Sequence, residues 1–65
     1  MTLDGHNKVI AAGFTLIRKR DVPEPGIWYK DTHTGEWSKM AQYKTKAARD
    51  RQFKELLKNE HIVED

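Results

Sequence analysis

The chain has 65 residues, with 12 lysines and arginines, 10 acidic residues and no cysteine. This length predicts one small domain with a modest core, and the lack of cysteine excludes disulfides and thiolate metal sites. No apolar run approaches the roughly 20 residues that span a bilayer, and the first residues lack a signal-peptide pattern, so we expect a cytoplasmic protein that does not bind membranes.

The net charge of +2 is distributed unevenly along the chain. Acids and bases balance over residues 1–36, whereas residues 37–59 carry seven lysines and arginines against two acids, a surplus of five. Residues 60–65 then add three acids. A local basic region indicates an anionic partner, although a solvated helix face with internal charge pairs explains it equally well.

The first half of the chain predicts an arm, a strand and a connection. Residues 1–8 are mostly polar and predict a flexible arm. Alternating and β-branched residues predict a strand over 13–20, with Gly13 at its start or at a bulge. Two prolines make 21–26 a connection, in which we expect Gly26 to adopt the positive φ that closes a turn.

A hairpin follows this connection. Residues 27–31 are rich in aromatic side chains and residues 37–43 alternate, so both are predicted strands. Asp31 can accept hydrogen bonds from the loop amides, and Gly35 suits a left-handed position, which together indicate a tight loop between the strands.

The register of the hairpin determines which side chains share a face, and two registers are open. We favour a four-residue loop at 32–35, which places on one face Trp28, Lys30, Trp37, Lys39 and Tyr43, opposite Ile27, Tyr29 and Met40. A three-residue loop with a bulge at Gly35 would instead place Trp37 and Tyr43 with Ile27 and Tyr29.

Residues 45–59 predict a helix, because they are good helix formers without Gly or Pro and Thr45 can cap the first turn. At about 100° per residue, one arc of this helix is apolar and an adjoining arc is basic. The apolar arc holds Phe53, Leu56 and Leu57, and the basic arc holds Arg51, Lys54 and Lys58.

These elements predict an α+β fold, in which one C-terminal helix packs on one face of a three-stranded antiparallel sheet. The domain is expected to comprise residues 9–60, followed by an acidic tail at 61–65.

Catalytic constellations are not apparent in the sequence. His6, His33 and His61 fall in the expected arm, loop and tail without the spacing of a metal site or of a nucleophile–base pair. Ser38 is the only serine and has no glycine elbow around it. We therefore expect a protein that is not an enzyme and that uses no cofactor, no metal and no small-molecule substrate.

Aromatic and basic residues alternate on the predicted hairpin, which is typical of surfaces that bind phosphates with cations and stack bases on rings. Two tryptophans in so small a protein also fit a core surrounded by lysine stems, and both interpretations are open. The predicted nucleic-acid contacts are Trp28, Lys30, Trp37, Lys39 and Tyr43 on the sheet, with Arg51, Lys54 and Lys58 on the helix.

Arg49 falls beside the apolar arc of the helix rather than on its basic arc. We expect it to pair with an acid such as Asp50 or Glu36, and a phosphate contact is the alternative.

The Gly-Glu-Trp strand at 35–37 and the run Tyr43-Lys44-Thr45-Lys46-x-Ala48, which opens a helix, resemble the end of a known family of small DNA-binding domains. These three-strand-and-helix domains occur at the N-termini of phage and transposon integrases and, more distantly, in AP2-type plant factors. The resemblance covers about the last two thirds of the chain. It implies that the free sheet face enters the major groove while the helix supports the sheet from behind. The longer first strand and the proline-rich connection depart from that pattern.

From these observations we expect a small bacterial or mobile-element accessory protein that binds nucleic acid, with duplex DNA as the first candidate. The alternative is a protein-interaction module, such as a small phage-type inhibitor or adaptor, that docks on a partner protein through exposed aromatic side chains.

Overall fold

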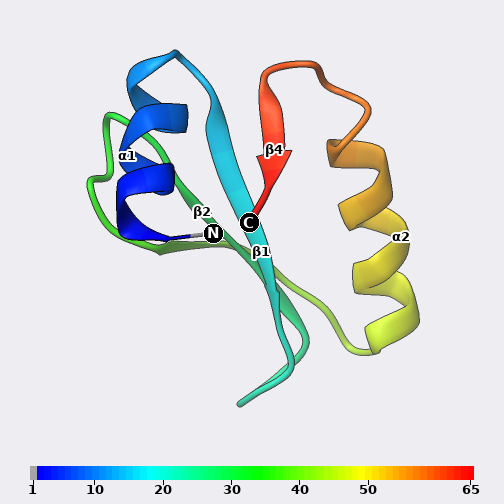
Figure 1. The fold of residues 1–65 in the computed structure, drawn as a ribbon. Helices are drawn as coiled ribbons and strands as arrows, with labels where there is room; N and C mark the ends of the chain where they lie inside the picture. Colours follow the sequence, from blue (N-terminus) through cyan, green and yellow to red (C-terminus); the bar gives the residue numbers. More distant parts are fainter. Residues whose placement is uncertain (1) are drawn as a thin grey trace.

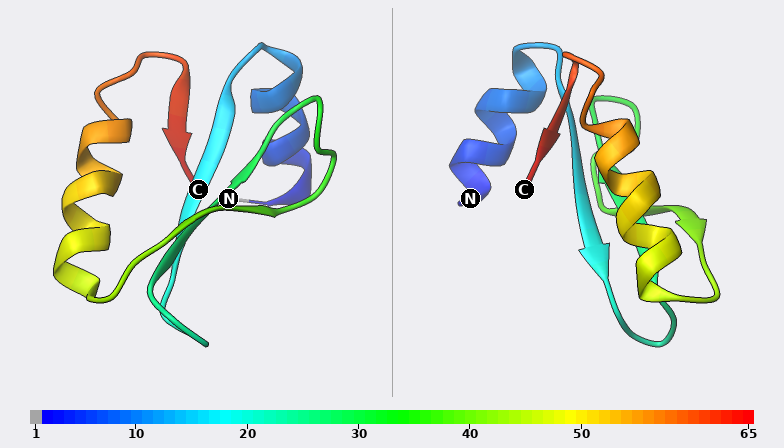
Figure 2. Two further views of the ribbon diagram at one scale, coloured as in Figure 1. Left: turned by 180° about the vertical axis from the view of Figure 1, so that it is seen from behind. Right: turned by 90° about the vertical axis from the view of Figure 1, so that its right-hand side faces the viewer.

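The computed structural model describes residues 2–65 and has an α+β fold, as predicted (Figure 1). The elements are, in chain order, α1 (Leu3–Ala11), β1 (Thr15–Arg20), β2 (Gly26–Lys30), β3 (Ser38–Gln42), α2 (Lys46–Leu56) and β4 (Ile62–Glu64). The strands form one sheet in the order β3-β2-β1-β4, in which β4 runs parallel to β1. The sheet is therefore mixed and four-stranded rather than antiparallel and three-stranded. It packs against two helices rather than one, and these lie on opposite faces of the sheet (Figure 2, right).

Helix α1 occupies most of the segment for which the sequence predicts a flexible arm. Its two buried residues, His6 and Ile10, are one helical turn apart, whereas Leu3 is 65% exposed. The Thr2 hydroxyl accepts a hydrogen bond from the amide of Gly5 at 3.1 Å and caps the first turn. A helix of this length is marginal in isolation, so its stability depends on burial against the sheet, which local sequence does not reveal.

The two glycines that flank β1 have different roles from those predicted. Gly13 has a φ of +98° and follows the last turn of α1, so it terminates this helix instead of starting a strand or forming a bulge. Gly26 lies inside β2 without a positive φ. A Cβ there would lie 3.1 Å from the carbonyl oxygen of Ala41, so the close approach of β3 accounts for this glycine.

Strand β1 buries side chains on both of its faces. Leu16 and Ile17 are both 0% exposed although alternation directs them to opposite sides. Ile17 packs with Ile27 and Phe53 on the side of α2, and Leu16 lies on the side of α1. Covered on both faces, β1 is the central strand of the fold.

The hairpin between β2 and β3 starts in the favoured register and then departs from it. Trp28 pairs with Lys39, as a four-residue loop requires, but Ile27 pairs with Ala41. Met40 is thus an extra residue in β3. Because of this bulge, the side chains after Met40 point to the opposite sheet face from the one that the uninterrupted register predicts. Tyr43, which we expected beside the tryptophans, consequently packs against the core on the α2 side.

The loop of this hairpin is held as predicted. The Asp31 carboxylate accepts hydrogen bonds from the backbone amides of His33 at 2.9 Å and Thr34 at 3.0 Å, and Gly35 has a φ of +66°. The Thr34 amide in particular holds the pKa of Asp31 below its usual value.

Helix α2 confirms the predicted helix and its apolar arc. The Thr45 hydroxyl accepts a hydrogen bond from the Ala48 amide at 3.1 Å. Phe53 is buried in the core, and Leu56 and Leu57 pack partly buried against it. The helix ends at Leu56, three residues before the predicted end.

Strand β4 lies in the segment predicted to be an acidic tail. Ile62, Val63 and Glu64 pair with residues 15–17 of β1, and β4 lies beside β1 in both views of the fold (Figures 1 and 2). Ile62 packs partly buried against the core. Two consecutive apolar residues are too few to predict a strand, and its partner is more than forty positions away in the sequence.

Candidate nucleic-acid interface

The tryptophans lie on the sheet face opposite α2, together with basic residues. We call this surface, formed by Arg18, Arg20, Trp28, Trp37 and Lys39, the tryptophan face. The Arg18 guanidinium carbon lies 3.9 Å from the centroid of the Trp37 ring, and that of Arg20 lies 4.1 Å from the centroid of the Trp28 ring. Such stacks combine cation–π attraction with burial of the flat guanidinium surface.

Strand periodicity and register together create this surface. Arg18 and Arg20 alternate with Ile17 on β1, and Arg18 pairs with Trp28 on β2. Trp28 in turn pairs with Lys39 on β3, before the bulge. Both tryptophans are half-buried and neither belongs to the core cluster, so the structure separates them from the core without leaving them fully exposed.

One half of the tryptophan face is closed by α1 and the C-terminal residue. The Asp65 carboxylate accepts a hydrogen bond from Arg18 Nε at 3.1 Å and lies 2.6 Å from His6 Nε2. The His6 ring meets Trp37 edge to face, with centroids 5.6 Å apart. Burial raises the pKa of Asp65, but the hydrogen bonds from Arg18 and His6 outweigh it and hold this pKa below its usual value. These contacts link α1, β1, the segment before β3 and the end of the chain.

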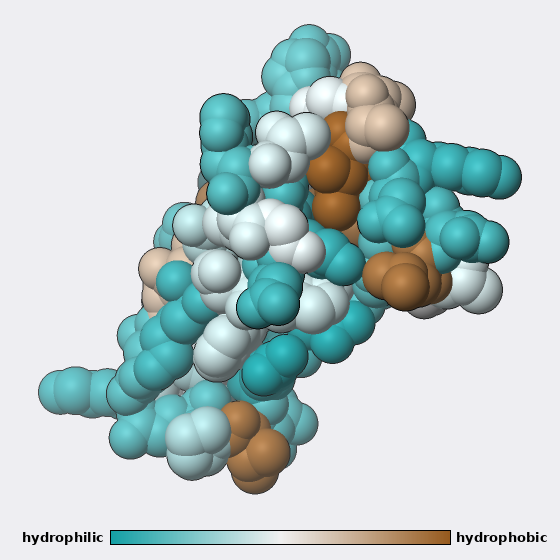
Figure 3. Space-filling model, turned by 90° about the vertical axis from the view of Figure 1, so that its left-hand side faces the viewer, coloured by the Kyte–Doolittle hydropathy of each residue, from teal (hydrophilic) through white to brown (hydrophobic). Residues whose placement is uncertain are grey.

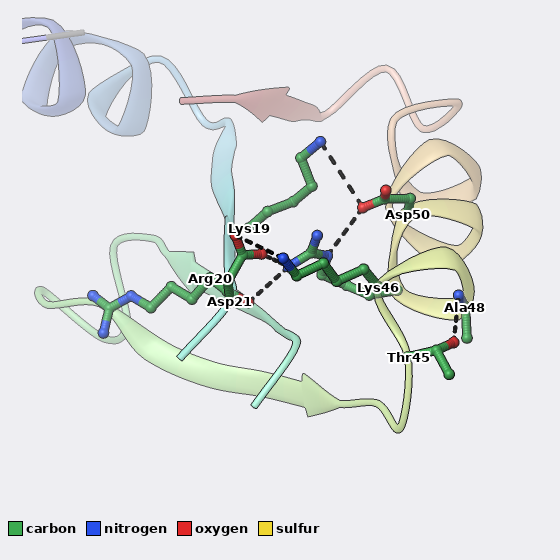
Figure 4. Close-up of polar contacts among 8 residues, drawn as sticks. Lys19, Arg20, Asp21, Thr45, Lys46, Ala48 and Asp50 are labelled. Carbon is green, nitrogen blue, oxygen red and sulfur yellow. Dashed lines mark hydrogen bonds and ion pairs between the residues drawn. The ribbon is translucent and has the colours of Figure 1, made fainter. Parts of the chain in front are cut away.

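The other half of the tryptophan face is open. Among the residues that the structure describes, no carboxylate forms an ion pair with Arg20. The Arg20 side chain points away from α2 and its acidic partners (Figure 4). Lys39 is exposed, and its Nζ donates to Gln42 Oε1 at 2.7 Å. Gln42 Nε2 donates in turn to the carboxylate of Glu24. A stacked arginine and an exposed lysine therefore border Trp28.

The structure brings together only part of the predicted contact set. Trp28, Trp37 and Lys39 share one face, as expected from the favoured register. Lys30 lies on this face beside Leu16, but it is only 8% exposed. Tyr43 is on the other face because of the bulge.

Helix α2 lies on the opposite face of the sheet from α1 (Figure 2), and the register places the tryptophans on the face that α2 does not cover. Arg51 and Lys54 of α2 are exposed, as is Lys58, which follows the end of the helix instead of lying on it as predicted; Lys58 Nζ is 3.0 Å from a carboxylate oxygen of Glu55. A ligand lying flat on the tryptophan face therefore does not reach these three residues. Arg20 is a contact candidate that the sequence prediction missed, although the alternation along residues 14–19, continued by one residue, places Arg20 on the same face as Arg18.

Arg49 has the acid partner that the sequence predicts, and further partners besides. Its Nε donates to Asp50 at 3.0 Å, and one terminal nitrogen donates to Asp21 at 2.5 Å and to the Arg20 carbonyl at 2.8 Å. The hydrogen bond from Arg49 holds the pKa of Asp21 below its usual value, and the hydrogen bond to Asp21 raises the pKa of Arg49. Arg49 thus joins α2 to the end of β1 and is not available to a phosphate.

Within residues 2–65, no group of three or more His, Cys, Asp or Glu side chains could hold a metal ion. None of the helices formed by these residues has the length and apolar character needed to cross a bilayer.

One side of the molecule is mainly hydrophilic, with small hydrophobic patches that are separate from one another (Figure 3).

Comparison of the chain with family models, with curated proteins and with solved structures gives no match. The resemblance to integrase and AP2-type DNA-binding domains therefore stays a prediction from the sequence.

Proposed function

We propose that this protein binds nucleic acid, without catalysis, through the open half of the tryptophan face. The observation that carries the proposal is the stack of Arg20 on Trp28, beside the exposed Lys39. A cation held against a ring places phosphate-binding and base-stacking groups next to each other.

The distribution of ion pairs favours this face over the basic arc of α2. Four basic residues that lie on α2, face it or follow its end already have acidic partners: Lys19 with Asp50, Lys46 and Arg49 with Asp21, and Lys58 with Glu55. Arg51 and Lys54 are the α2 cations without a partner among the described residues. Arg20 is likewise without an acidic partner, and it also has an aromatic ring beside it.

The test compares two pairs of charge-removing substitutions on opposite sides of the molecule. Arg20→Gln and Lys39→Gln alter the tryptophan face, while Arg51→Gln and Lys54→Gln make the same change in net charge on α2. Binding of a fluorescent oligonucleotide is measured by anisotropy over a range of salt concentrations. We expect each face substitution to weaken binding and to reduce the log–log salt slope by about one, because each removes one phosphate contact.

The α2 pair serves as the control, since it should change affinity less at every salt concentration. Equal effects of the two pairs would mean that net charge alone drives binding and would reject the assignment to this face. Wild-type protein that binds neither single-stranded nor duplex probes at about 50 mM salt, where phosphate binding is strong, would reject the function itself.

A second candidate function is supported by an open groove between α2 and the sheet. Phe53 and Leu57 contribute apolar surface to this groove. Charged residues of both signs also line it: the bases Lys19, Arg51 and Lys54 and the acids Asp50 and Glu64. An apolar surface bordered by both signs of charge suits a protein partner. Binding through it should depend weakly on salt and should be lost on Leu57→Asp, whereas Arg20→Gln should leave it intact.

A further inference from the structure

A hollow lies against the Trp28 ring, beside the Arg20 stack. Its volume is about 190 Å³, and it is bordered by Val22, Pro23, Gly26 and Gln42 as well as by Trp28. This volume is below the roughly 300 Å³ at which pockets for drug-sized ligands begin, so the hollow suits one flat ring system rather than a larger molecule.

The walls and the rim of the hollow differ in chemistry. Val22, Pro23 and Trp28 supply apolar and aromatic surface, and Gly26 brings no side chain: a Cβ there would lie 3.7 Å from Trp28 Nε1. The rim carries the hydrogen-bonded chain of Lys39, Gln42 and Glu24. This chain places an ammonium group, an amide and a carboxylate side by side, so the lining of the hollow includes both donors and acceptors.

We infer that this hollow binds a single unpaired nucleobase, stacked against Trp28 with its edge toward Gln42 and Glu24. The ligand is accordingly a single-stranded nucleic acid, with the phosphates next to the bound base near Arg20 and Lys39. This inference rests on the proposed function and specifies its ligand.

Base pairing explains why a duplex does not fit this arrangement. In a duplex, each base is stacked on its neighbours and its hydrogen-bonding edge faces the partner strand. The Trp28 ring therefore cannot stack on the base, and Gln42 and Glu24 cannot bind its edge. Helix α1 also lies over part of the same sheet face, which reduces the flat surface that a duplex groove could receive. An unpaired base needs only the hollow and the cations at its border.

The experiment separates base recognition from phosphate binding with three probes of equal length. These are a mixed-sequence single strand, a strand of abasic residues and a duplex. Each has about 12 nucleotides per strand, a length within the site sizes common for single-strand binders. The abasic strand keeps the phosphates and lacks the bases. We expect the single strand to bind roughly 5- to 150-fold more tightly than the abasic strand, which is the factor that one stacked base contributes.

Trp28 itself reports on stacking. The chain has two tryptophans, so Trp37→Phe leaves Trp28 as the only indole. In this variant we expect the single strand to quench the fluorescence and the abasic strand to leave it nearly unchanged at saturation. In the same background, Trp28→Phe should keep most of the preference for the single strand over the abasic strand, and Trp28→Leu should abolish it.

Gln42→Leu provides a test that does not depend on a half-buried residue. Gln42 is exposed, so its replacement should not prevent folding. It should weaken binding of the single strand much more than binding of the abasic strand, for which it removes only the hydrogen bond that positions Lys39. Gln52→Leu, at an exposed position on α2, is the matched control and should change neither.

The outcomes distinguish this inference from the function on which it rests. Equal affinity for the abasic and base-containing strands, or tighter binding of the duplex, would overturn the base site while leaving phosphate binding by the tryptophan face in place. Absence of binding to all three probes would overturn both. A clear preference for bases that Gln42→Leu does not reduce would overturn the placement of the base in this hollow.

Discussion

Arg49 is 4% exposed although it is a charged residue of a helix whose neighbouring positions are mostly solvated. Its guanidinium donates to two carboxylates and to one backbone carbonyl from different segments of the chain. A lysine cannot reproduce this arrangement, because its three donors radiate from one nitrogen instead of a planar fork.

Replacement of Arg49 by Met should lower the free energy of unfolding by about 1–3 kcal/mol, since it leaves the Arg20 carbonyl and the Asp21 carboxylate without their donor. The loss should fall in the lower part of this range, because the side chains of Asp21 and Asp50 are more than half exposed and water can replace the lost contacts. Urea unfolding measures this loss. The unfolding free energy of Arg49→Lys should lie between that of Arg49→Met and that of the wild type.

The exposed Arg51 offers the control on the same helix, because Arg51→Met should change the unfolding free energy by no more than about 0.5 kcal/mol. Similar losses for the two variants would mean that the hydrogen bonds of Arg49 contribute nothing specific.

Asp65 makes stability depend on acidic pH. Its folded-state pKa lies below that of an unfolded aspartate, so the unfolded state binds more protons between the two values. The stabilisation is complete above the unfolded pKa of about 3.9 and is lost as the pH falls through the folded-state pKa.

Urea midpoints measured between about pH 6 and pH 2 should therefore decrease steeply below about pH 4 in the wild type. Asp65→Asn should be less stable at pH 6, and its urea midpoint should decrease less steeply as the pH falls. The remaining decrease is due in part to Asp21 and Asp31, whose pKa values are also lowered. Parallel curves for the two proteins would contradict a role for the Asp65 carboxylate.

At the scale of elements, α2 is connected to the sheet through a few residues on one side. Phe53 is 4% exposed and packs with Ile17 and Ile27, while Leu56 lies at the border of this cluster. The bulge at Met40 contributes to the same contact, because it directs Tyr43 toward α2 instead of toward the tryptophans.

Phe53→Ala should lower the unfolding free energy by about 3–5 kcal/mol and could unfold a domain of this size. Leu56→Ala should cost less, at or below the lower end of the range of about 2–5 kcal/mol for buried leucines, since Leu56 is only partly buried. Lys54→Ala, between the two in the sequence, should be nearly neutral in the same thermal melts. A large loss for Lys54→Ala would show that the apolar arc is misassigned.

At the scale of the whole molecule, the two ends of the chain complete the fold. Helix α1 covers one face of the sheet, and β4 extends the sheet on the side of β1. The hydrogen bonds of Asp65 tie these parts together across 47 and 59 positions of sequence. A domain of 65 residues is marginally stable, so we expect the loss of such contacts to lower its stability measurably.

The contribution of β4 can be measured with Ile62→Ala, which should lower the unfolding free energy by roughly 1–3 kcal/mol, less than for a fully buried isoleucine. Glu60→Ala, whose side chain is 88% exposed, is the control and should be nearly neutral. If residues 61–65 were a solvated tail, the two variants would have equal thermal midpoints.

The sequence by itself determined the elements whose signals are local. The cap at Thr45, the apolar arc of α2, the alternation of β1 and the loop centred on Asp31 each depend on residues only a few positions apart, so periodicity and side-chain chemistry predicted them. For the hairpin the sequence left two registers open, and the favoured four-residue loop predicted correctly that Trp28 pairs with Lys39 and that both tryptophans share a face with Lys39.

Only the tertiary structure decided the elements and contacts that depend on distant partners. Helix α1 is stable because His6 and Ile10 are buried, and β4 because β1 offers a free edge; neither condition is visible in its own residues. Because of the bulge at Met40, Tyr43 packs against the core. Asp65 binds Arg18 in one half of the tryptophan face, whereas Arg20 in the other half has no acidic partner among the described residues. The physical reason is the same in each case: burial and pairing energies come from segments that the chain brings together only when it is folded.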